Sequence, residues 1–248
     1  MRVGIVTGGA SGIGRGIAAR LLAKGWNVVL ADVDGAGDAA AMLDDDRVRA
    51  CAVDLSNYRA ARDTVRMAID GWGRLDLLVN NAGGGVIAPF MEHDDASIER
   101  TITRNLLTTI HCCRAAIPAL RDHRGRIINI GAESVRNGLA MHAMYNAAKG
   151  GVHGLTTGLA RELAPEGITV NCVAPSIVAT DAVTRMLNDG DRLDPSWKAM
   201  LDQAVGLIPT GRAATVDEVA ATVCFLASRD ASFITGQVIS VNGGSSML

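Results

Sequence analysis

The sequence predicts an α/β fold in which a doubly wound, seven-stranded parallel sheet carries helices on both faces. Short apolar runs rich in valine and isoleucine alternate with longer segments of helical period, which is typical of a parallel sheet buried on both sides. No internal repeat and no linker rich in serine or proline divides the 248 residues. We therefore expect a single domain over residues 1–248, with 48% hydrophobic residues to build its core.

Each element follows from this alternation. The predicted strands are 3–7, 27–32, 48–53, 75–80, 126–130, 169–173 and 238–241. The predicted helices lie near 13–24, 35–43, 57–71, 95–123, 142–165, 181–204 and 215–228. The connection after the sixth predicted strand is longer and more polar than the other connections. Long connections are often functional loops, so we expect a substrate flap at about 176–212.

Composition excludes several classes of function. The net charge is -2 and no basic stripe is present, so a nucleic-acid partner is not expected. No apolar run approaches the roughly 18 residues of a membrane span, which favours a cytoplasmic protein without a membrane partner. The 5 cysteines show no CxxC spacing and are expected to be reduced packing residues rather than metal ligands. A small molecule is the expected partner.

The segment TGGASGIG at 7–14 directly follows the first predicted strand and opens the first helix. Glycines here allow a sharp turn and a close approach of a pyrophosphate, which the helix N-terminus attracts through its free N–H groups and dipole. A simple tight turn would use the same glycines. The position after the first strand favours dinucleotide binding, with these candidate contacts: Gly8, Ser11, Gly12, Ile13 and Gly14.

Asp32 ends the second predicted strand, where a carboxylate can accept hydrogen bonds from the adenosine ribose. The same charge would repel a 2′-phosphate, and Ser11 stands where a phosphate-bearing cofactor would favour a basic residue. NAD is therefore the predicted cofactor, although Asp32 also fits a solvated strand end. Asp54 and Leu55 follow the third strand, and Asp54 either contacts the adenine or only caps the next helix.

Tyr145 and Lys149 are four residues apart, so on a helix they share one face. The chain has only 2 tyrosines, and its only other lysines are Lys24 and Lys198, so this spacing is unlikely to be accidental. A phenol with a pKa of about 10 is a poor acid or base at neutral pH, but a nearby positive charge stabilises its phenolate. The pair is the predicted catalytic centre.

In order along the chain, TGGASGIG, Asp32, NNAG at 80–83, Asn105, Tyr145, Lys149 and APSIVAT at 174–180 resemble the short-chain dehydrogenase/reductase family. The resemblance covers essentially the whole sequence. It implies a Rossmann-type domain, usually a homotetramer or homodimer, that moves a hydride between a nicotinamide and a secondary alcohol or carbonyl. The hydride chemistry would belong to the cofactor.

The resemblance also implies roles for individual residues. Tyr145 would be the general acid/base, while Lys149 would bind the nicotinamide ribose and lower the pKa of Tyr145. Asn105 would position a water molecule of a proton relay. Further cofactor contacts would come from Asn81, Gly83, Val178 and Thr180.

The sequence departs from the family pattern at the substrate. A serine usually stands thirteen residues before the tyrosine, but here that position is Ala132. Residues two apart on an extended segment share a face, so Ser134 is the predicted replacement that polarises the substrate oxygen. Alternatively, Ser134 only shapes the loop, and His142 is the second candidate donor. Ser176 stands where glycine is common, which would restrict the backbone beside the nicotinamide.

Other polar residues of this segment are open to two interpretations. Glu133, Arg136, Asn137 and His142 either grip a polar substrate or face solvent on a loop.

We expect an NAD-dependent short-chain alcohol dehydrogenase or carbonyl reductase. A 3-oxoacyl-thioester reductase and a catalytically weak NAD-binding sensor or scaffold are the alternatives, and a methyltransferase would not explain the Tyr145 and Lys149 pair. The flap has few charges near the expected pocket, which favours a neutral substrate such as a cyclic or hydroxylated hydrocarbon-like alcohol, with polyols and acyl thioesters as the other options. The helices near 95–123 and 142–165 are candidate subunit faces.

Overall fold

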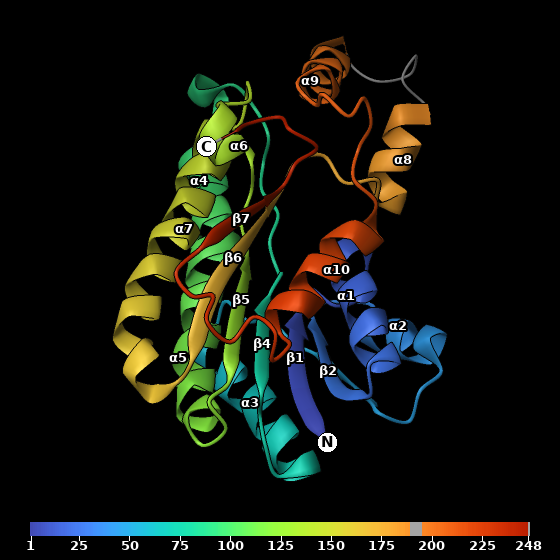
Figure 1. Cartoon of the computed structure of the whole chain (residues 1–248). Helices are drawn as coiled ribbons and strands as arrows, with labels where there is room; N and C mark the ends of the chain where they lie inside the picture. Colours follow the sequence, from blue (N-terminus) through green and yellow to red (C-terminus); the bar gives the residue numbers. More distant parts are fainter. Residues whose placement is uncertain (189–194, 248) are drawn as a thin grey trace.

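The computed structural model describes residues 1–188 and 195–247, which form one parallel sheet covered by helices on both faces (Figure 1). The strand order is β3-β2-β1-β4-β5-β6-β7, and every neighbouring pair is parallel. The prediction of a seven-stranded doubly wound fold is confirmed.

The strands are β1 (Arg2–Thr7), β2 (Trp26–Asp32), β3 (Val48–Ala52), β4 (Leu77–Asn80), β5 (Arg126–Ile130), β6 (Thr169–Pro175) and β7 (Val238–Val241). The α-helices are α1 (Gly12–Ala23), α2 (Ala36–Leu43), α3 (Tyr58–Trp72), α4 (Asp95–Ile102), α5 (Thr108–Arg121), α6 (Ser134–Asn137), α7 (Ala143–Leu163), α8 (Asp181–Asn188), α9 (Pro195–Gly206) and α10 (Val216–Leu226). Short helical turns are η1 (Phe90–Glu92), η2 (Thr103–Leu107) and η3 (Ala164–Glu166).

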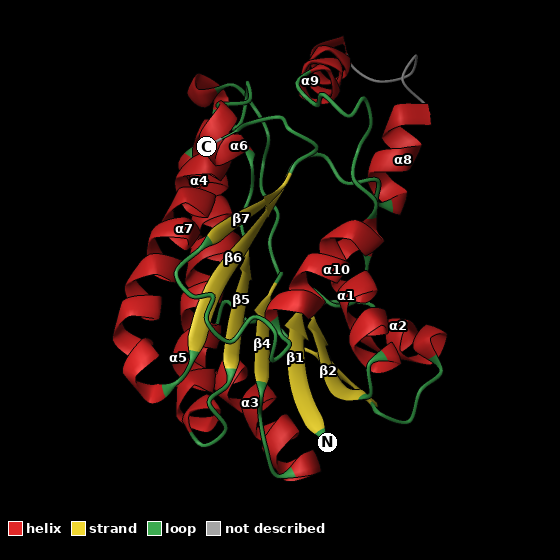
Figure 2. Cartoon of the chain, viewed as in Figure 1, coloured by secondary structure: helices red, strands yellow, loops and turns green. Residues whose placement is uncertain are grey.

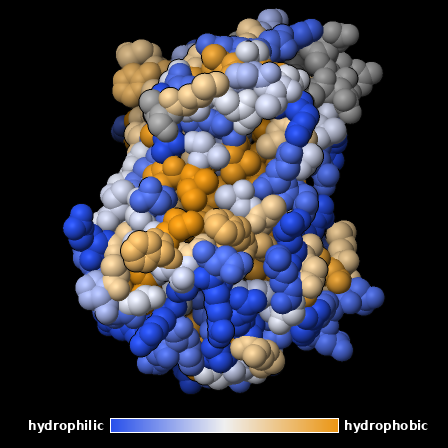
Figure 3. Space-filling model, viewed as in Figure 1, coloured by the Kyte–Doolittle hydropathy of each residue, from blue (hydrophilic) through white to orange (hydrophobic). Residues whose placement is uncertain are grey.

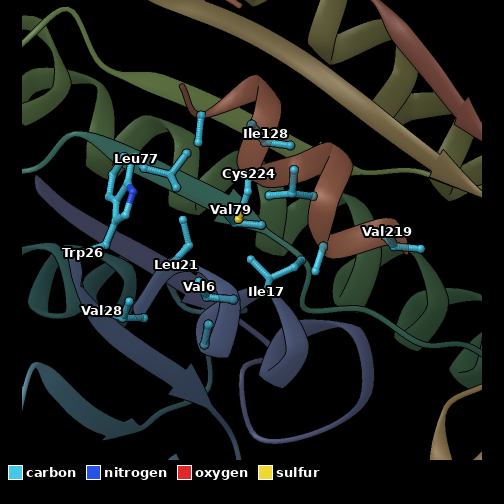
Figure 4. Packing of buried hydrophobic residues seen from close by; sticks show 14 of the residues in the cluster. Val6, Ile17, Leu21, Trp26, Val28, Leu77, Val79, Ile128, Val219 and Cys224 are labelled. Atoms are coloured by element: carbon cyan, nitrogen blue, oxygen red, sulfur yellow. The ribbon is translucent and has the colours of Figure 1, made fainter. Parts of the chain in front are cut away.

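Two hydrophobic cores lie on opposite faces of the sheet. Alternate side chains of a strand point to opposite faces, so Val6 joins the core under α1 and α10, whereas Val3 and Ile5 join the core under α3, α5 and α7. Figure 4 shows Ile17 and Leu21 of α1 packed toward the strands of the first core. Burial on both faces explains why the strands read as continuous apolar runs.

The carboxyl ends of the strands meet at one edge of the sheet, at the upper side of Figure 2, where α8 and α9 also lie. Strand β1 pairs with β2 on one side and β4 on the other, so the chain reverses its winding direction beside β1. Ligands of open α/β sheets bind in the crevice outside the carboxyl ends at such a switch point.

Two predicted helices are interrupted. The segment near 95–123 is divided by η2, a π-helical turn that places the buried Asn105 between α4 and α5. A π-helical turn inside a helix often marks a functional site. The segment near 181–204 forms α8 and α9, and residues 189–194 of the predicted flap lie outside the described residues.

Exposed apolar side chains gather around β7 and α10 on the face shown in Figure 3. Phe225 of α10 is partly exposed, and Phe233, which precedes β7, is fully exposed. Within residues 1–188 and 195–247, no helix has the length and apolar character needed to cross a membrane. The same residues contain no cluster of side chains suited to a metal ion, and all five cysteines are free.

Candidate active site

A cavity of about 1240 Å³ opens at the carboxyl ends of the strands. Fourteen of the predicted site residues line it, although they come from many separate elements. They are Gly8, Ser11, Gly12, Ile13, Asp32, Asp54, Leu55, Asn81, Gly83, Ser134, Tyr145, Lys149, Val178 and Thr180. Gly14 and Asn105 lie behind the wall.

The turn between β1 and α1 is built for close backbone packing. Gly8 has a φ of 62°, and a Cβ added at Gly14 would lie 2.0 Å from the Gly8 carbonyl oxygen, so neither position tolerates a larger residue without movement. Ser11 is the N-cap of α1 but makes no side-chain capping bond. The first N–H groups of α1 are therefore free to bind an anion.

Asn81 fixes this turn against β4. Its Nδ2 donates to the carbonyl oxygens of Thr7 and Gly8 at 3.0 and 2.9 Å, and its backbone N–H donates to the Thr7 Oγ1. Asn81 thus holds the turn between β1 and α1 from behind while also lining the cavity.

Asp32 stands at the end of β2, and its carboxylate accepts hydrogen bonds from the N–H groups of Ala10 and Val33 at 3.0 and 2.8 Å. Each carboxylate oxygen retains a lone pair that can accept from a hydroxyl group in the cavity. Asp54 accepts from the Ser56 N–H, which is the largest cause of its lowered pKa, whereas Asn57 caps α3. The interpretation of Asp54 as the helix cap is therefore wrong.

Tyr145 and Lys149 lie on one face of α7, with the ammonium 5.8 Å from the centre of the phenol ring. Lys149 is buried, and its Nζ donates to the Ile130 carbonyl oxygen at 2.8 Å. Burial lowers the pKa of Lys149 to about 8 and raises the pKa of Tyr145 to about 12. Burial therefore raises the pKa of Tyr145, whereas the charge of Lys149 was expected to lower it.

Asn105 is fully buried and holds the loop that faces Tyr145 and Lys149. Its Nδ2 donates to the carbonyl oxygens of Gly84 and Thr101, both at 2.8 Å. A Cβ added at Gly83 would lie 2.7 Å from the Asn105 Oδ1 and 3.2 Å from the Lys149 Nζ. Only glycine therefore fits between these two polar groups.

Ala132 and Ser134 both line the cavity, but they do not lie on an extended segment as expected. Ser134 begins the short helix α6, which turns the chain directly after β5. Its hydroxyl donates to the Asn146 Oδ1 at 2.6 Å, so its proton is already engaged. Ser134 is within the cavity wall, but polarising a substrate oxygen would require this bond to break.

Neither Glu133 nor Arg136 lines the cavity, and Glu133 is also shielded from solvent, so both interpretations of Glu133 are wrong. Glu133 is fully buried and accepts a hydrogen bond from the Ser246 hydroxyl. Arg136 donates to the Ser240 Oγ and the Val238 carbonyl oxygen of β7. The C-terminal segment, distant in sequence, folds over α6 and removes these charges from the cavity.

His142 precedes α7 and lines the cavity beside Tyr145, with the two ring centres 5.8 Å apart and nearly perpendicular at 83°. Its Nδ1 lies 2.7 Å from the Ala140 carbonyl oxygen. Burial lowers the pKa of His142, although this hydrogen bond opposes the shift. Asn137 also reaches the cavity wall, as one of its two interpretations required.

Ser176 has an ordinary backbone conformation. Its φ is negative, and its N–H donates to the Val241 carbonyl oxygen at 3.1 Å, which continues the pairing of β6 with β7.

An apolar wall closes part of the cavity, and its individual residues could not be identified from the sequence. Ile87, Leu139, Ile177 and Leu207 line it, and Leu139 and Ile177 pack in one cluster with residues of α9. These residues come from four unrelated segments and form no motif. Arg100 and Arg104, which line the cavity from α4 and η2, match no sequence motif either.

The fold and the cavity define a dinucleotide-binding oxidoreductase. A protein-family model described as "Enoyl-(Acyl carrier protein) reductase" matches residues 8–246. The chain belongs to the short-chain dehydrogenase/reductase family.

Several relatives align over nearly the full chain. The 2,3-dihydroxy-2,3-dihydro-p-cumate dehydrogenase of Pseudomonas putida is 49% identical, covering 100% of this chain and 95% of the relative. The cyclohexanol dehydrogenase of a Rhodococcus species is 36% identical over 98% of this chain and 95% of its own. Among solved structures, "ElxO with NADP Bound" has a TM-score of 0.90 and 28% identity, with 98% of both chains covered.

Proposed function

We propose that this oxidoreductase uses NAD to oxidise one secondary alcohol group of a cyclic vicinal diol. The observation that carries the proposal is that one cavity joins the phosphate-facing turn at Gly12, the Tyr145 and Lys149 pair, and an apolar wall. The name of the 49% identical relative, a dihydrodiol dehydrogenase, supports the diol, and the name of the cyclohexanol dehydrogenase supports a cyclic alcohol.

The residues at the adenosine end fit a dinucleotide. Glycines leave space beside the free N–H groups of α1, and Leu55 and Asp54 line the same end as Asp32. Asp32 favours NAD, since its negative charge would repel a 2′-phosphate. The basic residues that line the cavity come from α4, η2, α7 and α8 and not from the β1-α1 turn or the end of β2. When bound, the nicotinamide supplies the hydride acceptor.

The chain's own residues supply placement and proton transfer. Tyr145 takes the proton of the substrate hydroxyl as general base. Lys149 contributes a buried positive charge that would favour the phenolate, and its ammonium would hold the ribose of the bound cofactor. Asn105 holds that loop, while Asn81, Val178 and Thr180 complete the cofactor wall.

The apolar wall favours a ring over an extended polar chain. Leu139, Ile177 and Ile87 surround the substrate end, and Ala132 removes the hydroxyl that the family usually places there. A hydrocarbon ring contributes about 0.8 kcal/mol for each buried methylene group. The flap residues of α8 and α9 that reach the wall, including Val183 and Ala204, would enclose this ring.

We also propose that the chain assembles as a dimer or tetramer. The fully exposed Phe233 and the partly exposed Phe225 support an interface at β7 and α10, in addition to the helices expected to form subunit faces. Size-exclusion chromatography with light scattering tests this, and a species of 25.8 kDa would contradict it.

The deciding test follows NADH formation by absorbance with cis-1,2-cyclohexanediol, cyclohexanol and an acyclic 3-hydroxyacyl thioester. We expect the two cyclic alcohols to be oxidised with NAD and the thioester to be much poorer. Binding of NAD without turnover of any alcohol would support the sensor alternative. A preference for the thioester would support the reductase alternative.

A further inference from the structure

The hydrogen-bonding state of His142 determines what it can offer a substrate. Its Nδ1 lies 2.7 Å from the carbonyl oxygen of Ala140, and a carbonyl oxygen can only accept, so Nδ1 carries the proton. In a neutral imidazole the other nitrogen then has a free lone pair. The Nε2 of His142 is therefore an acceptor and not a donor.

That acceptor is unused within the protein. Among the described residues, no group bonds to the Nε2 of His142, and this atom is not among the fully buried polar atoms that lack a partner. His142 lines the cavity, so a ligand in the cavity can meet its ring. Because burial lowers the pKa of His142, the ring stays neutral at neutral pH and keeps this lone pair.

The position of the ring matches the second oxygen of a vicinal diol. The centres of the His142 and Tyr145 rings are 5.8 Å apart, and the rings meet edge to face. Both rings line the same cavity, and a vicinal diol carries two neighbouring hydroxyl groups, one for each ring. A ketone oxygen cannot donate a hydrogen bond to the His142 Nε2, whereas the second hydroxyl of a diol can.

Resting on the proposed function, we propose that His142 is a specificity-determining residue whose Nε2 accepts a hydrogen bond from the non-reacting hydroxyl of the vicinal diol. The reacting hydroxyl gives its proton to Tyr145. His142 remains unprotonated through the reaction, so it changes neither the electron nor the proton balance of the alcohol oxidation.

The test compares cis-1,2-cyclohexanediol with cyclohexanol, which differ by the second hydroxyl. In His142→Phe the ring stays against Tyr145 but the lone pair is lost, whereas His142→Gln keeps a side-chain acceptor. We expect His142→Phe to lower kcat/KM for the diol about five- to tenfold, mainly through KM. The effect on cyclohexanol should be several times smaller, and His142→Gln should recover part of the loss.

His123→Phe is the matched control, because this exposed histidine lies outside the cavity wall. It should leave the ratio of the two kcat/KM values unchanged. Equal losses for both substrates in His142→Phe would overturn the inference, since His142 would then act on the reacting oxygen or on Tyr145 itself.

A binding measurement separates this inference from the proposed function. Nitrogen-15 NMR of the NAD-loaded protein, assigned with His142→Phe, should show an unprotonated Nε2 whose shift changes with the diol and not with cyclohexanol. If this shift appears but neither alcohol is oxidised, the proposed function fails, while the hydrogen bond from the diol to His142 stands. A protonated Nε2, or no response to the diol, would refute the role of His142 even if both alcohols are oxidised.

Discussion

Asn105 and Gly84 form a reciprocal pair in which the Asn105 Nδ2 donates to the Gly84 carbonyl oxygen at 2.8 Å and the Gly84 N–H donates to the Asn105 Oδ1 at 3.2 Å. The π-helical turn η2 brings this buried amide to the loop, and the neighbouring Gly83 and Gly85 lie against Lys149 and Tyr145. Asn105 therefore links the segment of α4, η2 and α5 to the positions of Tyr145 and Lys149.

Asn105→Ala should lower both stability and activity. Loss of these bonds leaves buried groups unsatisfied and should cost about 1–3 kcal/mol of the free energy of unfolding, measured with urea. The loop would also shift, so kcat and KM should change together. Thr109→Val, which removes only the hydroxyl that donates to the Asn105 carbonyl oxygen, is the milder comparison. Lost activity at full stability would instead assign Asn105 a direct role, such as holding a water molecule.

Tyr145→Phe should reduce kcat by a factor between about 10² and 10⁴, because it removes the proton acceptor. The dissociation constant for NAD should rise by less than about tenfold, as measured by fluorescence quenching. Tyr58→Phe is the control, since Tyr58 packs between His111 and Arg114 on the other side of the sheet from α1. Comparable activity of the two variants would remove Tyr145 from the mechanism.

Much of this site was predictable because its residues belong to local patterns. The turn at Gly8 to Gly14 needs only one strand, one helix and glycine backbone freedom, and Tyr145 and Lys149 need only one helix. The strand pattern was equally clear, since burial on both faces leaves a continuous apolar run in the sequence.

The errors have two causes: contacts between segments distant in sequence, and local backbone turns that no residue pattern specifies. Glu133 looks like a loop carboxylate, but Ser246 from the chain's end covers it. Ser134 was placed on an extended segment, but four residues of helix at α6 redirect its hydroxyl to Asn146. The acceptor state of His142 depends on where the Ala140 carbonyl points, which no residue pattern specifies.

Ser134→Ala should lower kcat/KM by less than about tenfold. The hydroxyl it removes donates to Asn146, and such a bond contributes about 1 kcal/mol. The loss should be the same for the diol and for cyclohexanol, because the effect reaches the substrate only through the position of α7. A loss of a thousandfold would show that the hydroxyl turns away from Asn146 and polarises the substrate oxygen.

Lys149→Met should change how stability depends on pH. The folded-state pKa of about 8 lies below the unfolded value near 10.5, so the folded chain binds fewer protons than the unfolded chain between these values. The contribution of Lys149 to the free energy of unfolding therefore increases by up to about 3 kcal/mol as the pH rises from 8 to 10.5. The same amount is lost as the pH falls through this range.

Measured with urea, the free energy of unfolding of wild type should rise relative to that of Lys149→Met by up to about 3 kcal/mol between pH 8 and 10.5. Lys24→Met, which removes an exposed ammonium at the end of α1, is measured in parallel as the control. A constant difference between wild type and Lys149→Met across this window would show that the Lys149 pKa is not lowered.

Asp32→Ala should reduce the preference for NAD over NADP by about 10- to 100-fold in kcat/KM. Two unit charges about 5 Å apart repel by about 1–3 kcal/mol at an effective dielectric constant between about 80 and 20, and the variant removes one of them. Asp34→Ala removes a carboxylate two residues further on, outside the cavity wall, and should keep the wild-type ratio. High salt should lower the wild-type preference for NAD over NADP only slightly, because Asp32 is half-buried and its charge is poorly screened. Equal ratios in wild type and Asp32→Ala would mean that other groups choose the cofactor.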